Sequence, residues 1–336
     1  MAVDPSFTES QQLTESQTGP QGTSSQGFDY RATYTLGMPQ MLFEGLSERW
    51  LLKEAGDIHW RMLCGDLGVP SGQLADRGGE RLYASFMRIR MESTIPLTRY
   101  AENETLTVTG ALSRFGDKRF FSEQTFLGAA GEVRVEMASV FITRATDNKS
   151  LARATPQQIA RSRCHSHSIL PPFGQGYQKI KGLALEATEP VRDTVLELGG
   201  TAFDWVDRDV DARTYTVNPY HDFNGASLLY FASYPRIHDV CERLFLNERL
   251  RKAGYERDAA LEVAPMARDV YYYGNADAGD ELTFQLRRVD ASGPDHLRMW
   301  STLSRRRDGV RIADVFTVKA LTDPASAALR LLTGAG

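Results

Sequence analysis

Hydrophobic positions change their spacing along the chain, and each spacing predicts a different element. Tyr30, Ala32 and Tyr34 alternate with polar residues, as in a half-buried strand. After a turn at residues 37–39, hydrophobic positions recur every three or four residues, which predicts a helix beginning near residues 45–47. Its apolar stripe consists of Leu51, Ala55, Ile58 and Met62, widened by Trp50 and Leu63. Because apolar sides outnumber polar ones, we expect this helix to lie deep against a sheet.

Strand-like runs follow this helix after a glycine-rich turn. They lie at residues 82–91, 104–112, 119–127 and 132–143. The pattern predicts one unit made of a strand, a long helix and about four antiparallel strands. Residues 145–180 break the pattern, with the stiff pair Pro171-Pro172 near their end, and we place a domain boundary there.

The opening of this unit recurs later in the chain. Residues 33–47 read TYTLGMPQMLFEGLS and residues 214–227 read TYTVNPYHDFNGAS, with seven identities across a one-residue gap. About one identity would arise by chance, so the chain contains two copies of one domain. The second copy predicts a helix with one apolar face and then strands at residues 269–273, 281–289, 297–305 and 311–321. That apolar face consists of Ile237, Val240, Cys241, Leu244 and Phe245.

The strings RDVYYY at residues 268–273 and DAGDEL at residues 277–282 resemble a strand and turn of acyl-thioester hot-dog proteins. AENETL at residues 101–106 is the counterpart in the first copy. The paired arrangement therefore resembles a double hot-dog, an α+β fold in which antiparallel sheet wraps around two long central helices. We divide the chain into a disordered tail (1–27), a first hot-dog domain (28–148), a linker (149–180), a second hot-dog domain (181–325) and a C-terminal tail (326–336).

A narrower resemblance is carried by GMPQ at residues 37–40, GLSE at 45–48, GDIHW at 56–60 and DFNGA at 222–226. Over residues 33–322 the chain resembles the bifunctional acyltransferase/decarboxylase of the leinamycin pathway and its relatives in other polyketide clusters. The resemblance implies that methylmalonyl-CoA is loaded through a tyrosine, decarboxylated, and delivered as propionyl to the phosphopantetheine arm of an acyl carrier protein. It implies no cofactor beyond the CoA thioester, which is the substrate.

Composition excludes several other classes. The 336 residues carry a formal net charge of −4, which is not the broad basic footprint of a nucleic-acid-binding protein. No apolar stretch approaches the roughly 20 residues needed to span a membrane, and no signal sequence opens the chain, so we expect a cytoplasmic protein. Three cysteines without a CxxC motif support neither disulfides nor a zinc site. Two copies in one chain make a monomeric pseudo-dimer sufficient, with a homodimer also possible.

Decarboxylation of a malonyl thioester places negative charge on the thioester oxygen, which requires fixed hydrogen-bond donors. Asn224 and Gly225 are expected where the second helix begins, with Gly225 letting the ligand approach the backbone. Asn224 is either a donor to the thioester or a helix cap, and both roles can hold together. The first copy has Glu44 at the equivalent position, where a carboxylate would repel a malonyl group, so we expect one working site per chain.

The remaining candidates are Tyr83, His59, His221 and Asp222. The resemblance points to Tyr83 as the acylated tyrosine, with hydrogen bonding to the thioester or simple packing as alternatives. His59 is either a proton-transfer group or a core histidine. His221 and Asp222 precede the second helix and are expected to line the substrate site.

Two other functions stay open. A hot-dog thioesterase or dehydratase needs a carboxylate or histidine in the site, and Glu44 or Asp222 would serve. A non-catalytic protein that binds acyl thioesters is the third. Docking to an acidic carrier protein would need a basic patch, for which Arg88, Arg90 and residues 305–307 are candidates.

Overall fold

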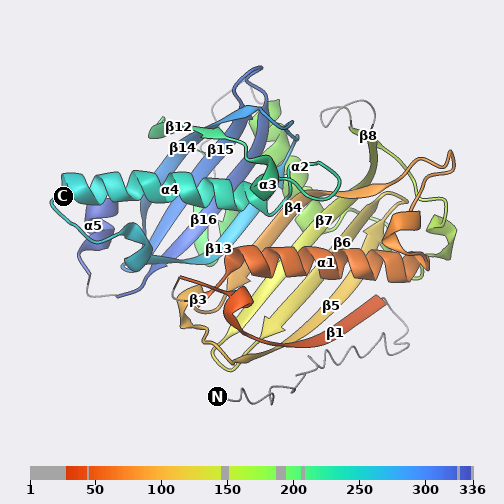
Figure 1. Cartoon of the computed structure of the whole chain (residues 1–336), viewed down its shortest axis with the longest axis horizontal. Coiled ribbons are helices and arrows are strands. Elements are labelled where there is room, and N and C mark those ends of the chain that lie inside the picture. The colour runs from red at the N-terminus through yellow and green to blue at the C-terminus, as the bar shows by residue number, and fades with distance from the viewer. Residues whose placement is uncertain are drawn as a thin grey trace, which may run out of the picture.

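A sheet of twelve strands, antiparallel except for the short parallel pair of β5 (Thr105–Phe115) and β9 (His165–His167), runs through the protein, and two long helices lie across one of its faces (Figure 1). The computed structural model describes residues 28–43, 45–144, 151–186, 194–205, 209–323 and 326–333. The predicted tail at residues 1–27 and Glu44 lie outside the described residues.

The order of strands in one half of the sheet mirrors the order in the other. From one edge, the first half contains β1 (Phe28–Thr35), β5 (Thr105–Phe115), β6 (Arg119–Leu127), β7 (Glu132–Arg144) and β4 (Tyr83–Ser93). The second half continues with β13 (Val263–Tyr272), β16 (Arg311–Leu321), β15 (His296–Arg305), β14 (Glu281–Ser292) and β12 (Asp211–Thr216). The short strands β8 (Leu151–Arg153) and β9 (His165–His167) attach to β7 and β5.

The repeated sequence segments form the two outer edges. Tyr34 of β1 lies opposite Leu106 of β5, and Tyr215 of β12 lies opposite Leu282 of β14. The two halves join in the middle through the antiparallel pair β4 and β13, where Ile89 lies opposite Val270. All eight strands predicted by the hydrophobic pattern of the two copies are present, with shifts confined to their ends. The internal repeat is therefore visible as a structural repeat.

The helix α1 (Glu48–Leu67) begins where the pattern predicts. Ser47 caps it, because the backbone N–H of Trp50 donates to the Ser47 hydroxyl over 3.2 Å. Gly68 ends it in the left-handed conformation, with φ of 67°, which glycine adopts without a Cβ penalty. The expected apolar stripe faces the sheet: Leu51, Ala55, Ile58 and Met62 are all buried.

The helix α4 (Ser233–Lys252) departs from its predicted face. Ile237, Cys241 and Phe245 are buried, but Val240 and Leu244 are 39% and 49% exposed. The buried face instead includes the polar residues His238, Glu242 and Asn247, which have partners in the sheet and the following loop. The prediction used hydrophobic positions alone, so the predicted buried face of α4 is rotated about the helix axis relative to the observed one.

A second layer covers the opposite face of the sheet. It contains α2 (Pro172–Leu185) and the hairpin of β10 (Thr194–Leu198) and β11 (Thr201–Asp204). Tyr177 and Phe203 of this layer pack with Tyr271, Trp300 and Phe316 of the sheet in a core of their own. The predicted second domain starts at residue 181, but residues 181–185 complete α2 and residues 194–204 form this hairpin.

The remaining short elements are β2 (Met41–Leu42), β3 (Gly45–Leu46), α3 (Pro219–Asp222) and α5 (Ala328–Thr333). The helix α5 falls in the region predicted as a C-terminal tail, and its Ala328 and Leu332 are fully buried. None of the helices in the described ranges combines the length and apolar character required to cross a membrane.

Candidate functional site at the junction of the two copies

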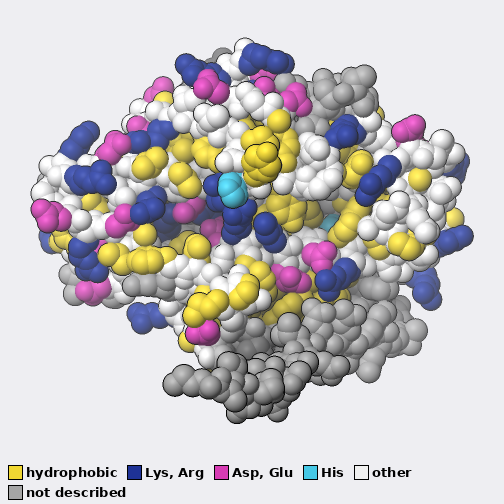
Figure 2. Space-filling model, viewed as in Figure 1, with side chains coloured by type: hydrophobic (Ala, Val, Ile, Leu, Met, Phe, Trp, Pro, Cys, Tyr) yellow, Lys and Arg dark blue, Asp and Glu magenta, His cyan; other side chains and the backbone are white. Residues whose placement is uncertain are grey.

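The first turns of α1 and α4 lie near each other in the middle of the molecule, and residues 217–232, which lead into α4, contact α1 (Figure 1). Three cations of the first copy contact this segment. Arg49 donates to the carbonyl of His221 over 3.0 Å, and Arg144 donates to the carbonyl of Ala226 over 2.6 Å. The Lys53 amine lies 5.6 Å from the centre of the Tyr230 ring. Figure 2 shows basic and hydrophobic side chains side by side in the middle of this face.

Asp222 anchors this segment to the second copy. Its carboxylate is fully buried and accepts hydrogen bonds from the Tyr215 hydroxyl (2.9 Å) and the Asn218 backbone N–H (2.7 Å). It also forms an ion pair with Arg236 in the second turn of α4. Because both carboxylate oxygens are engaged, Asp222 positions the segment and has no oxygen free to act as a base.

Asn224 lies in the turn between α3 and α4, and the expectation that it begins the second helix is wrong. Its side-chain oxygen accepts from the backbone N–H groups of Ala226 (3.0 Å) and Leu228 (3.1 Å), which is an Asx-type turn. The helix starts only at Ser233, with Ala232 as its N-cap residue. The turn holds the carboxamide in a fixed orientation, and within the described ranges its NH₂ group has no hydrogen-bond partner.

His221 and Gly225 are exposed on the same segment. The His221 imidazole makes no hydrogen bond or ion pair with any residue that the structure describes. A Cβ atom added at Gly225 would meet no heavy atom within 4 Å, so the space beside the Asn224 turn is open to a ligand. The structure thus brings together three of the predicted residues, His221, Asn224 and Gly225, on a segment anchored by a fourth, Asp222.

Phe231 brings the two copies into close contact beside this turn. Its ring lies against Gly56 of α1, where an added Cβ would be 2.3 Å from the ring. Its ring centre is 4.5 Å from that of Phe86 in β4, and its carbonyl accepts from the Tyr272 hydroxyl over 3.1 Å. Gly56 is therefore required for the close approach of α1 to the segment that carries Asn224.

Glu48 is a carboxylate near the junction that the sequence analysis did not single out. It forms a two-pronged ion pair with Arg268 of β13, with distances of 2.5 and 3.1 Å. Burial raises the pKa of Glu48 above its usual range, and the charge of Arg268 opposes that shift. Since Arg268 is only 1% exposed, the pair is a structural connection between the copies.

His59 lies away from this segment, inside the first copy. It is fully buried, with Nδ1 2.7 Å from the Ser122 hydroxyl and Nε2 2.8 Å from the Ser139 hydroxyl. Burial lowers its pKa to about 3, so the ring is neutral at physiological pH. His238 has the same place in the second copy, 2.7 Å from Ser301, again 63 residues further along the chain. These features favour the alternative that His59 is a core histidine.

Tyr83 is not brought together with the other candidates. It begins β4 and packs with the side chains on the face of the sheet that α2 covers, and its ring lies 5.1 Å from the Arg81 guanidinium. His59 belongs to α1, on the opposite face. Strand periodicity alone did not show which face Tyr83 occupies.

Two of the predicted docking residues are wrong for a physical reason. Arg88 and Arg90 both form ion pairs with the fully buried Asp269, and Arg88 is itself only 3% exposed. Burial keeps Arg88 from a carrier protein, and Arg90, 19% exposed, is held by the same carboxylate. Among residues 305–307, Arg305 pairs with Asp308 and Arg306 with Glu281.

The whole architecture is similar to solved structures of twice-repeated hot-dog proteins. A protein of Lactobacillus plantarum, provisionally assigned as an oleoyl thioesterase, superposes with a TM-score of 0.60 and 13% identity over 89% of this chain and 98% of that one. The 12:0-ACP thioesterase from Umbellularia californica superposes with a TM-score of 0.55 and 10% identity over 88% of this chain and 94% of that one. An acyl-ACP thioesterase from Bacteroides thetaiotaomicron superposes with a TM-score of 0.52 and 12% identity over 87% of this chain and 97% of that one.

The chain has a double hot-dog fold. The fold class predicted from the repeat is confirmed. No protein-family model and no curated protein matches the sequence. The narrower resemblance of this double hot-dog to acyltransferase/decarboxylases therefore stays a prediction.

Proposed function

We propose that the protein is an enzyme that hydrolyses acyl thioesters at the junction of its two copies. One observation carries the proposal: Asp222 fixes a segment on which the His221 imidazole and the Asn224 NH₂ group make no hydrogen bond with the described residues. Support comes from the double hot-dog proteins of similar structure, whose names describe them as acyl thioesterases.

Hydrolysis needs a base for the attacking water and a donor for the oxygen that gains charge. In the proposed mechanism His221 takes a proton from water as its oxygen bonds to the thioester carbon. The Asn224 NH₂ group donates to the resulting oxyanion. The carbon–sulfur bond then breaks, and the His221 imidazolium returns the proton to the departing thiolate. The exposed Gly225 leaves room for the thioester beside the turn.

The carboxylates considered for this role are less suitable. Asp222 uses both oxygens in hydrogen bonds and its ion pair, and Glu48 is paired with Arg268. Glu44 lies outside the described residues. This leaves the histidine as the better supported base.

Acyl transfer with decarboxylation has weaker support. It needs Tyr83 beside the thioester, whereas Tyr83 packs on the face covered by α2. That reaction also needs a hydrogen-bond donor to the enolate oxygen, and Asn224 could supply it just as it could donate to the oxyanion of hydrolysis. Asn224 therefore does not distinguish the two reactions. The substrate is proposed to be a CoA or carrier-protein thioester, because both present the same phosphopantetheine thioester.

The test is a thiol-release assay with acyl-CoA thioesters of increasing chain length and with methylmalonyl-CoA. Intact-mass analysis of a holo acyl carrier protein in the same reaction detects transfer. We expect release of CoA with an unmodified carrier. His221→Ala and Asn224→Ala should each reduce kcat/KM by about 10²–10³-fold. The matched control is Tyr220→Phe, which changes a 93% exposed neighbour and should stay within about twofold of wild type.

Other outcomes would overturn the proposal in defined ways. Wild-type rates in both His221→Ala and Asn224→Ala would remove the site. A propionyl carrier that disappears in Tyr83→Phe would establish the acyltransferase/decarboxylase reaction instead. Binding of acyl-CoA without turnover would indicate a non-catalytic acyl-thioester-binding protein.

A further inference from the structure

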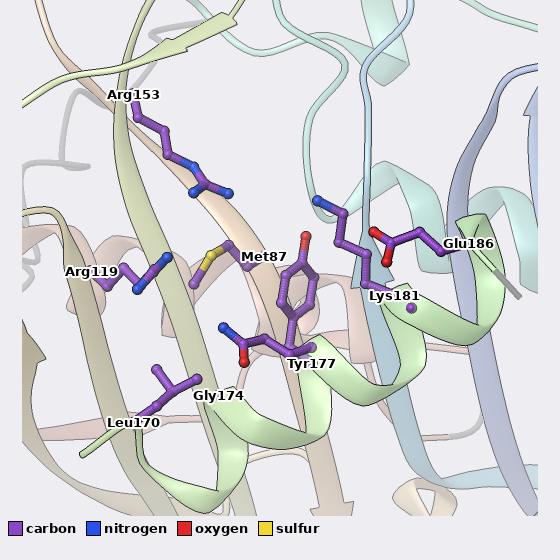
Figure 3. A pocket seen from close by; sticks show the side chains of 10 residues that line it. Met87, Arg119, Arg153, Leu170, Gly174, Tyr177, Lys181 and Glu186 are labelled. Carbon is purple, nitrogen blue, oxygen red and sulfur yellow. The ribbon is translucent and has the colours of Figure 1, made fainter.

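A cavity of 280 Å³ opens beside α2, on the face of the sheet opposite α1 and α4. Figure 3 shows its cationic side chains arranged around Tyr177. Arg119 comes from the start of β6, Arg153 from the end of β8 and Lys181 from α2. The cavity thus exists only where the linker packs on the first copy, and it is separate from the junction of the copies.

Within the described ranges the three cations have no acidic partner, and the Arg119 guanidinium lies 5.7 Å from the centre of the Phe115 ring. The guanidinium groups of Arg119 and Arg153 and the amine of Lys181 form no hydrogen bond or ion pair with a described residue. In contrast, Arg88 and Arg90 of the neighbouring strand β4 both form ion pairs with the carboxylate of Asp269. Like charges that converge on a cavity repel one another, so an anion bound there would lower the electrostatic energy.

The charge of the lining fits a phosphate group. Glu186 is the only carboxylate of the lining, so its four charged side chains sum to about +2 at neutral pH. A phosphate monoester carries about −1.5 to −2 at pH 7. Guanidinium groups match phosphate oxygens in two-pronged hydrogen bonds, which a single amine cannot do.

Beside the charged groups and Gln178, the lining contains apolar side chains. Met87 and Leu170 line the cavity with the ring of Tyr177. The Tyr177 hydroxyl donates to the carbonyl of Tyr272 over 3.0 Å, which holds the ring as a wall. Gly182 contributes open space, since a Cβ atom added there would meet nothing within 4 Å. Met87, Leu170 and the Tyr177 ring therefore offer a surface for a carbon group beside the cations.

We propose that this cavity is a binding site for a phosphate monoester. Its phosphate lies among Arg119, Arg153 and Lys181, and its carbon part contacts Met87 and Leu170. The proposal does not depend on the proposed hydrolysis, because it concerns a different face of the sheet.

The experiment is isothermal titration of the full chain with phenyl phosphate, and with inorganic phosphate and benzoate for comparison. We expect phenyl phosphate to bind at least about tenfold more tightly than either, since only it combines a phosphate with a carbon group. The double variant Arg119→Gln/Arg153→Gln should weaken binding by more than about tenfold. The matched control is Lys179→Gln, which removes a charge from an exposed position of α2 outside the lining and should change binding by less than about twofold.

A steric variant provides an independent arm. Gly182→Phe should place a ring in the open space and abolish binding, while the thermal unfolding curve stays close to that of wild type. The proposal is overturned if phenyl phosphate does not bind at millimolar concentration, or if benzoate binds as tightly. It is also overturned if Lys179→Gln weakens binding as much as Arg119→Gln/Arg153→Gln, or if a folded Gly182→Phe protein binds like wild type.

Discussion

Glu48, in the first turn of α1, and Arg268, in β13, form an ion pair that joins the two copies, with 2.5 Å between Oε1 and Nε. Glu48→Gln would remove the charge of the close partner and leave the buried guanidinium only the more distant carboxylates of Asp239 and Glu242. We expect the free energy of unfolding to fall by about 2–4 kcal/mol, measured by urea denaturation. Glu281→Gln, which breaks the exposed pair with Arg306, should cost less than about 1 kcal/mol. Equal losses in the two variants would contradict a structural role for the buried pair.

The two buried histidines should make the protein sensitive to mild acid. Burial lowers the pKa of both His59 and His238 to about 3, whereas an unfolded histidine titrates near 6.5. Between these values the unfolded chain binds more protons, so stability falls as pH decreases. From pH 7 to pH 5, each histidine should remove about 2 kcal/mol from the free energy of unfolding.

Urea denaturation of His59→Gln and His238→Gln at both pH values checks this linkage. Each variant should lose less stability on acidification than wild type, by about 2 kcal/mol. Both variants are expected to be less stable than wild type at pH 7, because the hydrogen bonds to Ser122, Ser139 or Ser301 change. An unchanged pH dependence would show that the histidine concerned is not buried as a neutral ring.

Gly56→Ala should disturb the contact between the copies. The new methyl group would meet the Phe231 ring at 2.3 Å, and moving that ring also disturbs its packing on Phe86. We expect a loss of about 1–3 kcal/mol in thermal or urea unfolding. The double variant Gly56→Ala/Phe231→Leu removes the clash and should recover part of that loss. Additive effects of the two substitutions would mean that the side chains do not touch.

Asp222→Asn tests the anchor of the proposed catalytic segment. The substitution removes the charge that pairs with Arg236 while keeping a similar shape. We expect kcat for thioester hydrolysis to fall by about 10–100-fold, with KM changed less than about twofold, because His221 and Asn224 lose their fixed placement. Steady-state kinetics below the melting temperature of the variant separates this from unfolding. An unchanged kcat would show that the segment holds its position without the ion pair.

The long strands of the sheet were predictable because each has a local signal, whereas the short strands β8 and β9 lie in residues 145–180, where the hydrophobic pattern breaks. The run at residues 119–127 became β6 with the same bounds, and the helix start near residues 45–47 became α1 with Ser47 as its cap. The likeness of residues 33–47 to residues 214–227 supplied the long-range information that the second half of the sheet repeats the first. Tyr34 and Tyr215 accordingly occupy matching edge positions.

The misplaced features depend on contacts between distant residues. Arg88 and Arg90 have the pattern of exposed charges, but both form ion pairs with Asp269, which is buried on a strand of the other copy. The helix α4 begins at Ser233 and not near Asn224, because the Asn224 side chain accepts from two backbone N–H groups of its own turn. Aligning the second repeat with the start of α1 could not show this turn. The sequence analysis did not identify Arg236 as a residue of the site. The available signal was an arginine shortly after Asp222, at a spacing that allows an ion pair.

The pairing of β4 with β13 has a consequence during synthesis. Arg88 and Asp269, which meet across this pair, are 181 residues apart in the chain. At roughly 5–20 residues per second, a ribosome takes about 10–40 s to deliver the second of them. During that interval the first copy presents the hydrogen-bonding edge of β4 to any other strand, including β4 of a neighbouring nascent chain. Slower translation of the second half should therefore increase co-translational aggregation of this protein.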